Sequence, residues 1–467
     1  MHHPATAAFP VFSLPNDFSA CPNITMNQAK RPRAEVSSQP RLYPDRVNGS
    51  MGYQSKVRVT DKYKVVGFIS SGTYGRVYKA LGRQGQPGEF AIKKFKPDKE
   101  GEQASYTGIS QSAVREMALC SELNHPNVIR LIEIILEDKC IFMVFEYAEH
   151  DLLQIIHHHT QQPRHPIPPT TIKSIMFQLL NGCQYLHTNW VLHRDLKPAN
   201  IMVTSSGEVR IGDLGLARLS YKPLHSLYSG DKVVVTIWYR APELLLGSRH
   251  YTPAVDLWAV GCIFAELLSL RPIFKGEEAK MDSKKTVPFQ RNQMQKIVDI
   301  MGLPTKERWP LLTSTPEYSQ LPTLQPPISH GHHHHHGHHY QAQRQAGSVS
   351  QLEKWYYNTI NQHTNSGPGP SSAPLASLGA EGYKLLAGLL EYDPEKRLTA
   401  AAALQHPFFT TGDPVSSNCF AGLKTEYPHR RVSQDDNDIR TSSLPGTKRS
   451  GLPDDTLARP LKRAKEG

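Results

Sequence analysis

Residues His193–Asn200 read HRDLKPAN and are the most informative stretch of the chain. They place Asp195, a carboxylate that can accept a proton, five residues before Asn200, whose amide oxygen can bind a divalent cation. Four specified positions (His, Arg, Asp and Asn) are expected by chance in a chain of this length with odds of about three in a thousand. We therefore interpret the stretch as a loop built for one chemical task.

Two shorter motifs follow this loop toward the C-terminus. Asp213–Gly215 (DLG) comes after a predicted pair of short strands and supplies a second carboxylate for a divalent cation. Ala241–Glu243 (APE) ends the segment, with Glu243 thirty residues beyond Asp213. Phosphoryl transfer needs charge neutralisation, alignment and a base, and this order of motifs would supply them.

A glycine-containing turn precedes the loop. Ile69–Val77 reads ISSGTYGRV, and its backbone can approach phosphate groups closely. Ser70 stands where the first glycine of the usual GxGxxG pattern would be, so we expect a slightly stiffer turn. Any turn between two strands needs glycine, so this pattern alone is a weak signal.

A lysine and a glutamate complete the set. Phe90–Lys93 (FAIK) reads as a strand that carries Lys93 among apolar neighbours, eighteen residues after Gly75. A predicted helix at Thr107–Asn124 supplies Glu116, which could pair with Lys93 and hold it against the α- and β-phosphates of ATP. A lone strand lysine is usually solvated, but the ordered set of six motifs predicts an ATP-dependent phosphoryl transferase.

Hydrophobic patterns predict an α+β fold with a strand-rich first lobe and a helical second lobe. Short β-branched and aromatic runs from Tyr63 to Phe95, and again at Lys139–Glu146, predict a small antiparallel sheet. From Thr170 onward helical periods dominate. The predicted organisation is a disordered tail at 1–56, one domain at 57–409 with lobes at about 57–146 and 149–409, a low-complexity insert at about 322–375, and an extension at 410–467.

Histidine runs at His157–His159 and His332–His339 raise the possibility of a metal site. A flexible homopolymer lacks the fixed surroundings that a specific metal site needs. We therefore interpret both runs as low-complexity sequence and assign no structural metal to them.

Composition excludes several classes of protein. The net charge is +11, but residues 61–409 carry only +5, so the basic character lies mostly in the tails and gives weak support for nucleic-acid binding. Six cysteines without a CxxC pair fit reduced thiols in the cytosol or nucleus. No signal peptide is expected, and the most apolar later stretch, Val260–Leu268, is too short to span a bilayer.

Basic clusters in both tails resemble nuclear-import signals. They lie at Lys30–Arg33, at Lys448-Arg449 and at Lys462–Lys465. Ordinary solvated charge is an equally good interpretation of these clusters. A nuclear location is therefore an expectation that rests partly on the family resemblance below.

From about Tyr63 to Phe409 the chain resembles the eukaryotic protein kinases, and within them the cyclin-dependent kinases. The stretches WYRAPELLLG (Trp238–Gly247), DLWAVGCIFAELL (Asp256–Leu268) and DPEKRLTA (Asp393–Ala400) carry this resemblance. The chain is most similar to the Mediator-associated kinases that work with cyclin C. That similarity lies in SAVRE (Ser112–Glu116), FEYAEHDL (Phe145–Leu152), the PAN ending of the loop, LLGSRHYTPAVDLW, FAGLKTEYPHR (Phe420–Arg430) and the tail SGLPDD…KRAKE.

The resemblance implies a bilobal protein kinase fold and specific residue roles. Lys93 and Glu116 would form the activating ion pair, Asp195 would accept the substrate proton, and Lys197 would contact the γ-phosphate. Asn200 and Asp213 would hold Mg²⁺. The implied ATP-binding residues are Ile69, Ser70, Ser71, Gly72, Thr73, Tyr74, Gly75, Arg76, Val77, Ala91, Lys93, Phe145, Glu146, Tyr147 and Ala148.

The resemblance also bears on regulation and on substrate choice. Asp231 occupies the position of the activating phosphothreonine, and its implied receivers are Arg115, Arg194 and Arg218. We expect Asp231, or an acid donated by a cyclin docked on the SAVRE helix, to replace the phosphate in part. The alternative is that Asp231 is an ordinary loop acid. Thr236 suits serine or threonine substrates, and Arg240 is typical of kinases that prefer proline after the phosphorylated residue.

The implied function is phosphorylation of the RNA polymerase II C-terminal domain and of transcription factors within the Mediator kinase module. Expected partners are a cyclin C-type cyclin and other subunits of that module, with no direct nucleic acid and no membrane. A mitogen-activated kinase would need a Thr-x-Tyr between Asp213 and Glu243, which is absent. The alternatives left open are a non-catalytic scaffold that docks cyclin and Mediator, and, less favoured, a DNA-binding protein.

Overall fold

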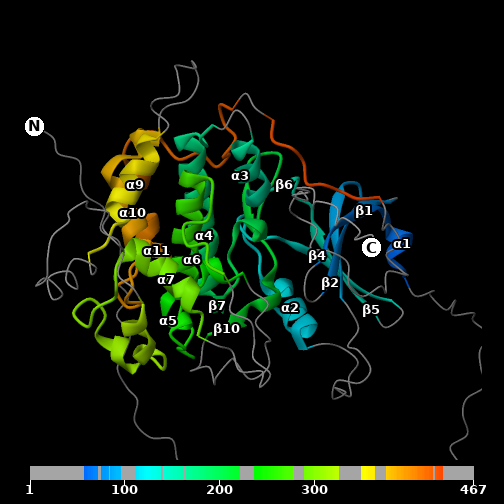
Figure 1. Cartoon of the computed structure of the whole chain (residues 1–467). Helices are drawn as coiled ribbons and strands as arrows, with labels where there is room; N and C mark the ends of the chain where they lie inside the picture. Colours follow the sequence, from blue (N-terminus) through cyan, green and yellow to red (C-terminus); the bar gives the residue numbers. More distant parts are fainter. Residues whose placement is uncertain are drawn as a thin grey trace, which may run out of the picture. The chain divides into compact units, whose positions relative to one another are not determined.

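The computed structural model describes residues 57–71, 75–83, 85–95, 111–137, 140–161, 165–220, 236–277, 289–324, 349–362, 375–423 and 426–434 of the 467-residue chain. These residues form a strand-rich first lobe followed by a helical second lobe (Figure 1). The predicted α+β, two-lobed fold is therefore confirmed. The tail predicted at residues 1–56 lies outside the described residues.

The first lobe is built on an antiparallel sheet with the strand order β1-β2-β3-β5-β4. These strands are β1 (Tyr63–Ser71), β2 (Gly75–Gly82), β3 (Glu89–Phe95), β4 (Leu131–Glu137) and β5 (Cys140–Glu146), and the short helix α1 (Val59–Lys62) precedes them. A cluster that includes Tyr63, Tyr78, Ile92 and Val144 is buried against the sheet. β1 and β4 are the two edge strands.

Helix α2 (Gln111–Glu122) follows β3 in the chain and falls within the helix predicted at Thr107–Asn124. Leu119 and Cys120 of α2 are buried in the core. The helix also contacts the 3-10 turn η2 (Leu214–Leu216), which belongs to the second lobe. α2 therefore spans the boundary between the lobes on the side where Glu116 lies.

Helices α4 (Pro169–Thr188) and α6 (Ala254–Ser269) form the centre of the second lobe and pack against each other. α6 is buried along nearly its whole length, because most of its residues are apolar and its two acids, Asp256 and Glu266, have hydrogen-bond partners. The other helices of this lobe are α3 (Leu152–Thr160), α5 (Pro242–Leu245), α7 (Arg291–Met301), α9 (Leu352–Asn361), α10 (Gly379–Leu389), α11 (Ala400–Leu404) and α12 (Pro407–Thr410). Among the described residues, no helix combines the length and the apolarity needed to cross a bilayer.

Short strands and 3-10 turns carry the motifs that the sequence singles out. The strands are β6 (His150–Asp151), β7 (Val191–Leu192), β8 (Ile201–Val203), β9 (Val209–Ile211) and β10 (Arg218–Leu219). The turns besides η2 are η1 (Pro198–Asn200), η4 (Ile237–Tyr239), η5 (Pro310–Ser314), η6 (Tyr318–Thr323) and η7 (Leu375–Leu378). The HRDLKPAN loop therefore lies between β7 and β8, and DLG directly follows the β8–β9 pair.

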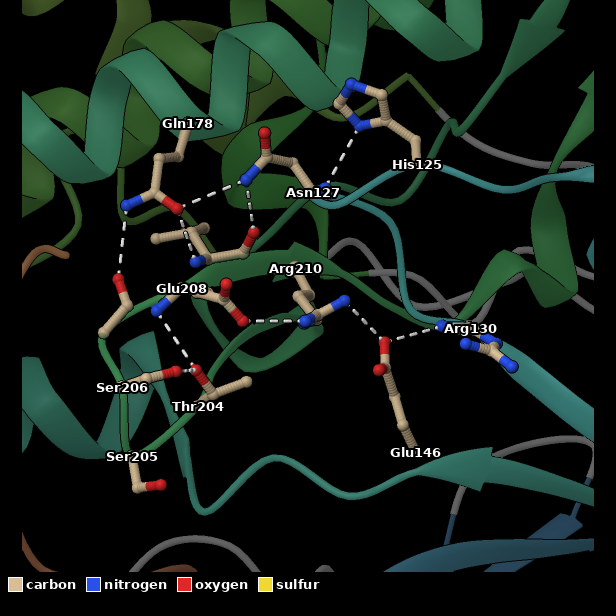
Figure 2. A network of polar contacts seen from close by, with 12 residues as sticks. His125, Asn127, Arg130, Glu146, Gln178, Thr204, Ser205, Ser206, Glu208 and Arg210 are labelled. Atoms are coloured by element: carbon tan, nitrogen blue, oxygen red, sulfur yellow. Dashed lines mark hydrogen bonds and ion pairs between the residues drawn. The ribbon is translucent and has the colours of Figure 1, made fainter. Parts of the chain in front are cut away.

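A polar network joins the sheet to the second lobe (Figure 2). The Asn127 side chain, in the segment before β4, donates to Gln178 Oε1 of α4 (3.2 Å) and to the Val209 carbonyl (2.9 Å). Glu146, at the end of β5, accepts from Arg210 Nη1 of β9 and from the Arg130 backbone N–H, both at 2.9 Å. Because these groups come from segments far apart in the sequence, the network holds the end of β5 and the segment before β4 against β9 and α4.

The predicted low-complexity insert contains a folded element. Helix α9 lies inside residues 322–375, and its Leu352, Tyr356 and Ile360 are buried. Their spacing of four residues places them on one face, which packs against α6, α7 and α10. The prediction of a continuous low-complexity segment is therefore wrong at α9, because a single short amphipathic helix was hidden among polar residues.

The histidines His157–His159 are also part of a folded element, since they form the last turn of α3. His159 is buried; its Nδ1 donates to the His165 carbonyl (3.1 Å) and its Nε2 lies 2.9 Å from the Tyr427 hydroxyl. Interpreting this run as low-complexity sequence was wrong, because the helix and residues distant in the chain hold it in place. The run at His332–His339 lies outside the described residues.

The chain continues past the predicted end of the domain at Phe409 and packs back onto it. We call residues 411–423 and 426–434 the C-terminal strap. Its beginning covers α4, where Lys173 donates to the Thr411 and Asp413 carbonyls and Ser174 donates to the Ser416 carbonyl. In Figure 1 the strap is the orange to red trace that runs past α3 and β6 to β1. The extension predicted to begin at residue 410 is therefore folded against both lobes as far as Gln434.

Candidate functional site

Lys93 lies at the centre of a three-residue charge cluster. It sits in the middle of β3, with Val77 of β2 and Met143 of β5 as its cross-strand partners. Its ammonium donates to both carboxylate oxygens of Glu116 on α2 (2.7 and 2.8 Å) and to Asp213 Oδ1 (2.9 Å). The ion pair that the sequence suggested is therefore formed, and the DLG carboxylate joins it.

Charge compensation sets the protonation of this cluster. Glu116 is 1% exposed and Lys93 is 11% exposed. Although burial alone would lower the pKa of Lys93, the carboxylates of Asp213 and Glu116 raise it above its usual value. The positive charge of Lys93 in turn lowers the pKa of Asp213 to about 2. Lys93 is thus a permanent cation and Asp213 a permanent anion at neutral pH.

Gly215 keeps room for this cluster. A methyl group at this position would lie 3.1 Å from Glu116 Oε2 and 3.3 Å from Asp213 Oδ1. Asp213 itself has a φ of 56°, in the left-handed region that residues other than glycine rarely adopt. The DLG motif therefore combines a strained backbone with a missing side chain, and both serve the position of the Asp213 carboxylate.

The HRDLKPAN loop holds the second carboxylate. Asp195 Oδ2 accepts from Lys197 Nζ (2.8 Å) and from Asn200 Nδ2 (3.1 Å), and the Asp195 carbonyl also accepts from Asn200 Nδ2 (2.8 Å). Burial raises the pKa of Asp195, while the charge of Lys197 acts in the opposite direction. These contacts leave Asp195 as an ordered, poorly hydrated carboxylate.

Asp256 of α6 supports the loop from below. Its carboxylate accepts from the backbone N–H groups of His193 (2.9 Å) and Arg194 (2.8 Å) and from His187 Nε2 (2.9 Å). Burial alone would raise the pKa of Asp256, but the hydrogen bond and charge of His187 lower it. His193 Nε2 donates to the Gly212 carbonyl (2.8 Å), which ties the loop to the residue before DLG. Sequence reasoning assigned no role to Asp256, although this residue lies in the quoted DLWAVG stretch.

The described members of the predicted ATP-binding set lie on four strands and in the segment after β5. Ile69, Ser70 and Ser71 end β1, Gly75, Arg76 and Val77 begin β2, Ala91 and Lys93 lie on β3, Phe145 and Glu146 end β5, and Tyr147 and Ala148 follow β5. Ala91 and Phe145 are direct cross-strand partners. The Glu146 N–H donates to the Arg130 carbonyl (3.1 Å), so this donor is committed to β4 and its neighbours. Gly72, Thr73 and Tyr74 lie outside the described residues.

The donor set suits Mg²⁺. Asn200 turns its amide nitrogen toward Asp195, which leaves its side-chain oxygen as the atom available to a cation, and Asp213 is ionised. The Gly212 N–H donates to the Asn200 carbonyl (2.8 Å), so the two candidate ligands belong to adjoining backbones. Mg²⁺ typically binds through one or two such oxygens together with substrate phosphates. The described ranges contain no cluster of three or more His, Cys, Asp or Glu side chains that could hold a metal ion.

The structure describes all of the predicted regulatory and substrate residues except Asp231. Arg218 lies on β10, which pairs with β7 just before Arg194, and its Nη1 donates to the Ala217 carbonyl (3.0 Å). The Arg194 guanidinium lies over the Tyr251 ring at 4.5 Å. Arg115 lies on α2, one residue before Glu116. Thr236 and Arg240 flank η4, with Thr236 exposed. Asp231 lies outside the described residues.

Glu243 of the APE motif forms a buried ion pair. Its carboxylate accepts from Nη1 (2.8 Å) and Nη2 (3.0 Å) of Arg397, whose side chain has no exposed surface. Arg397 also donates to the carbonyls of Ala254 and Glu391, each at 2.8 Å. Arg397 lies in the quoted DPEKRLTA stretch, but it is 154 residues from Glu243, so the sequence alone did not predict the pair.

Comparison with known proteins agrees with this geometry. The family model described as protein kinase domain matches residues 63–409. The serine/threonine-protein kinase SSN3 of Chaetomium globosum is 87% identical over 464 residues, which cover 98% of this chain and 90% of that protein. The protein of the same name in Pyricularia oryzae is 75% identical, covering 90% and 92%, and the ssn3 kinase of Aspergillus fumigatus is 73% identical, covering 90% and 94%.

Proposed function

Because the chain belongs to the protein kinase family and is a serine/threonine protein kinase, we propose that it is the catalytic subunit of a cyclin-dependent complex that regulates transcription. Its partners in this proposal are a cyclin C-type cyclin and the other subunits of the Mediator kinase module. Its substrates are the RNA polymerase II C-terminal domain and transcription factors, and its location is the nucleus. The resemblance of SAVRE and YAEHDL to the Mediator-associated kinases supports this specific assignment.

The observation that carries catalysis is the Lys93 cluster together with Asp195. The ammonium of Lys93 is held by Glu116 and Asp213, which places one cation beside the strands proposed to bind ATP. Asp195 lies on the facing loop with its carboxylate ordered by Lys197 and Asn200. Phosphoryl transfer requires this combination of positioned cations and a proton acceptor.

Each residue has a role in the proposed reaction. Lys93 binds the α- and β-phosphates of ATP, and Lys197 binds the γ-phosphate. Asp195 orients the substrate hydroxyl and accepts its proton, for which burial and the resulting higher pKa make it a better base. Asn200 and Asp213 would hold Mg²⁺, which supplies neutralisation of the phosphate charge when bound.

Adenine recognition would use the segment after β5. Glu146 to Ala148 present backbone groups at the end of the sheet, and Phe145 closes the space behind them. Because the Glu146 N–H already donates to Arg130, we propose its carbonyl as the contributing group at this residue. In this proposal Thr236 favours serine or threonine as the phosphorylated residue, and Arg240 favours a proline directly after it.

Regulation in this proposal acts through α2 and the activation segment. A cyclin that docks on α2 would position Glu116, and an acid at Asp231 or from the cyclin would stand in for a phosphothreonine opposite Arg115, Arg194 and Arg218. The pairing of β10 with β7, which brings Arg218 and the residues before Arg194 together, supports this arrangement. If a purified kinase and cyclin pair stayed inert until another kinase modified Ser226 or Ser229, this mode of regulation would be wrong.

Replacing Asp195 tests catalysis. Asp195→Ala should lower kcat for a Ser-Pro peptide by about a thousandfold, because the general base is lost, with little change in the melting temperature. Glu353→Gln, at an exposed position of α9, is the control and should retain full activity. A fully active Asp195→Ala protein would contradict the catalytic role, and unchanged target-gene regulation in cells that carry this variant would favour the scaffold alternative.

Affinity purification followed by mass spectrometry tests the partners. The proposal expects a cyclin and Mediator subunits to co-purify with the full chain. Failure to recover them would refute the specific assignment and leave the kinase assignment intact. The two experiments therefore separate catalysis from complex membership.

A further inference from the structure

The C-terminal strap ends its described course on the edge of the first-lobe sheet. The Phe68 N–H donates to the Ser433 carbonyl (2.8 Å), and the Ser433 N–H donates to the Phe68 carbonyl (2.8 Å). Phe68 lies on β1, an edge strand, so Ser433 extends the sheet by one residue. We call this pair the β1 latch. It lies one residue before Ile69, where the proposed ATP-binding turn begins.

The strap is anchored to the second lobe before it reaches the latch. Tyr427 is buried beside His159, and His150 Nδ1 donates to the Pro428 carbonyl (3.0 Å). The Arg430 N–H donates to the Glu149 carbonyl (2.7 Å), and Arg430 Nε lies 3.4 Å from Asp151 Oδ2. Because these anchors lie on α3, on β6 and on the residue before β6, and the latch lies on β1, the strap ties the two lobes together.

The sequence at the latch has the composition of a kinase substrate. Residues 430–436 read RRVSQDD, and Arg430-Arg431 is the one pair of adjacent arginines in the chain. These arginines stand three and two residues before Ser433. A serine kinase with carboxylates in its peptide groove would bind two such guanidinium groups through charge-assisted hydrogen bonds.

We propose that Ser433 is a phosphorylation site for a second, arginine-directed serine kinase, and that the phosphate releases the β1 latch. The chain itself is not the expected modifying enzyme, because Gln434 follows the serine and Arg240 points to a preference for proline. That contrast rests on the proposed function. In the reaction the Ser433 hydroxyl oxygen bonds to the γ-phosphorus of ATP, the bond to the β-phosphate bridging oxygen breaks, ADP leaves, and the hydroxyl proton passes to a carboxylate of the modifying kinase.

Access to Ser433 requires only a local opening of the strap. Ser433 and Val432 are half-buried, and Arg431 and Gln434 are exposed. Beyond Tyr427 the contacts of the strap include those named above, a contact of Arg430 Nη1 with Met202 Sδ (3.3 Å) and the packing of the His429 ring against His150. Segments of this kind open with free energies well below that of global unfolding. The modifying kinase can therefore bind residues 430–433 in an open form while both lobes stay folded.

The phosphate favours the open form for electrostatic reasons. A phosphoserine carries about two negative charges at neutral pH, and Asp435 and Asp436 stand two and three residues after it in the sequence. Closing the latch would bring this charge against the half-buried edge of β1 and remove part of its hydration. Arg430 is already paired with Asp151 in the closed form, so the closed strap does not offer this cation to the phosphate without breaking that contact.

Mass spectrometry and hydrogen exchange test the proposal on the full chain. Treatment with cyclic-AMP-dependent kinase and Mg-ATP should place one phosphate on Ser433, and exchange at the Phe68 and Ser433 amides should then become at least about tenfold faster, since each loses its hydrogen bond. Arg431→Ala, which removes an exposed recognition residue, should lower the rate of modification by at least about tenfold.

Two further variants complete the experiment. Ser433→Ala keeps the backbone pair, so it should take up no phosphate at this position and show unchanged exchange. Ser433→Pro removes the N–H that donates to Phe68, so without any phosphate it should reproduce the fast exchange at Phe68. A phosphorylated chain should also show a higher KM for ATP, whereas the exchange measurement does not depend on kinase activity.

Two results would overturn the proposal. The first is a synthetic peptide of residues 426–440 that is modified while the full chain remains unmodified at Ser433, which would mean that the latch does not open. The second is a fully phosphorylated chain with unchanged exchange at Phe68, which would mean that the phosphate does not release the latch. If phosphorylation makes exchange at Phe68 faster as expected but leaves the KM for ATP unchanged, this result would instead contradict the ATP-binding role proposed for β1.

Discussion

At the scale of single residues, the site is a set of charges that compensate one another. Lys93 contacts two carboxylates, and Asp195 contacts Lys197, so removal of one partner changes the protonation or the position of the other. Asp256 plays the same part beneath the loop through two backbone N–H groups and His187. Single substitutions that preserve shape are therefore the sharpest tests.

Glu116→Gln removes one charge and keeps the size of the side chain. We expect kcat/KM to fall by about tenfold to a hundredfold, because Lys93 then turns toward Asp213 and loses its fixed position against the phosphates. Peptide phosphorylation at varied ATP concentration measures the change. Glu122→Gln, on an exposed position of the same helix, should leave kcat/KM unchanged. Equal activity of the two variants would contradict the role of the ion pair.

Lys197→Met should change the pH dependence of kcat. A nearby cation favours the ionised form of a carboxylate, so removing Lys197 raises the pKa of Asp195 further above its usual value. Catalysis needs ionised Asp195, so the midpoint of the acid limb of the pH profile should move to higher pH. Its maximum should also fall, because Lys197 is proposed to bind the γ-phosphate. The exposed variant Lys396→Met is the control, and a midpoint that moves to lower pH would refute the assignment.

At the scale of secondary structure, elements with ordinary sequences owe their places to distant partners. α5 is only four residues long, and the Glu243–Arg397 pair fixes it to the segment before α11. α9 holds its place through Leu352, Tyr356 and Ile360, which pack on one side of the helix. Short helices of this kind are marginal in isolation and depend on such contacts.

Arg397→Met should destabilise the second lobe. Removing one partner of a buried ion pair leaves an uncompensated charge on Glu243, which costs about 3 to 5 kcal/mol. Urea denaturation followed by fluorescence measures the free energy of unfolding. Lys384→Met breaks the exposed Glu381–Lys384 pair and should cost less than about 1 kcal/mol. If both variants lost the same stability, the buried pair would not hold α5 in the way described.

At the scale of the whole molecule, the strap makes the C-terminal segment part of the kinase domain. It begins on α4, passes over α3 and β6, and ends on β1, so it contacts elements of both lobes. Cys419 and Tyr427 of the strap are buried, and Tyr427 lies in a ring cluster with His150, His158, His159 and Phe420. The domain therefore extends beyond the residues that the family model matches.

Truncation after Thr410 should lower the free energy of unfolding by at least about 3 kcal/mol, because burial of Tyr427 and of other apolar strap surface is lost. Truncation after Gln434 keeps every described strap contact and should leave stability unchanged. Thermal unfolding of the two chains beside the full chain measures the difference. A chain that ends at Thr410 with full stability would show that the strap contacts contribute nothing net.

The amino-acid sequence alone determined the lobes, the motifs and their chemistry. Contiguous stretches such as HRDLKPAN and DLG carry fixed spacings, and hydrophobic periods report local structure, so both can be recognised without coordinates. The fold class, the Lys93–Glu116 pair and the strand at Lys139–Glu146 were predictable in this way. Composition misled where a folded element was short and polar, as at α9 and His157–His159.

Only the tertiary structure decided the contacts between distant parts of the chain. Asp213 approaches Lys93 across 120 residues, Arg397 approaches Glu243 across 154, and Tyr427 approaches His159 across 268. None of these pairs leaves a periodic or local signal, because packing of the lobes creates them. The β1 latch belongs with them, since Ser433 meets Phe68 only after the strap has crossed from the second lobe to the first.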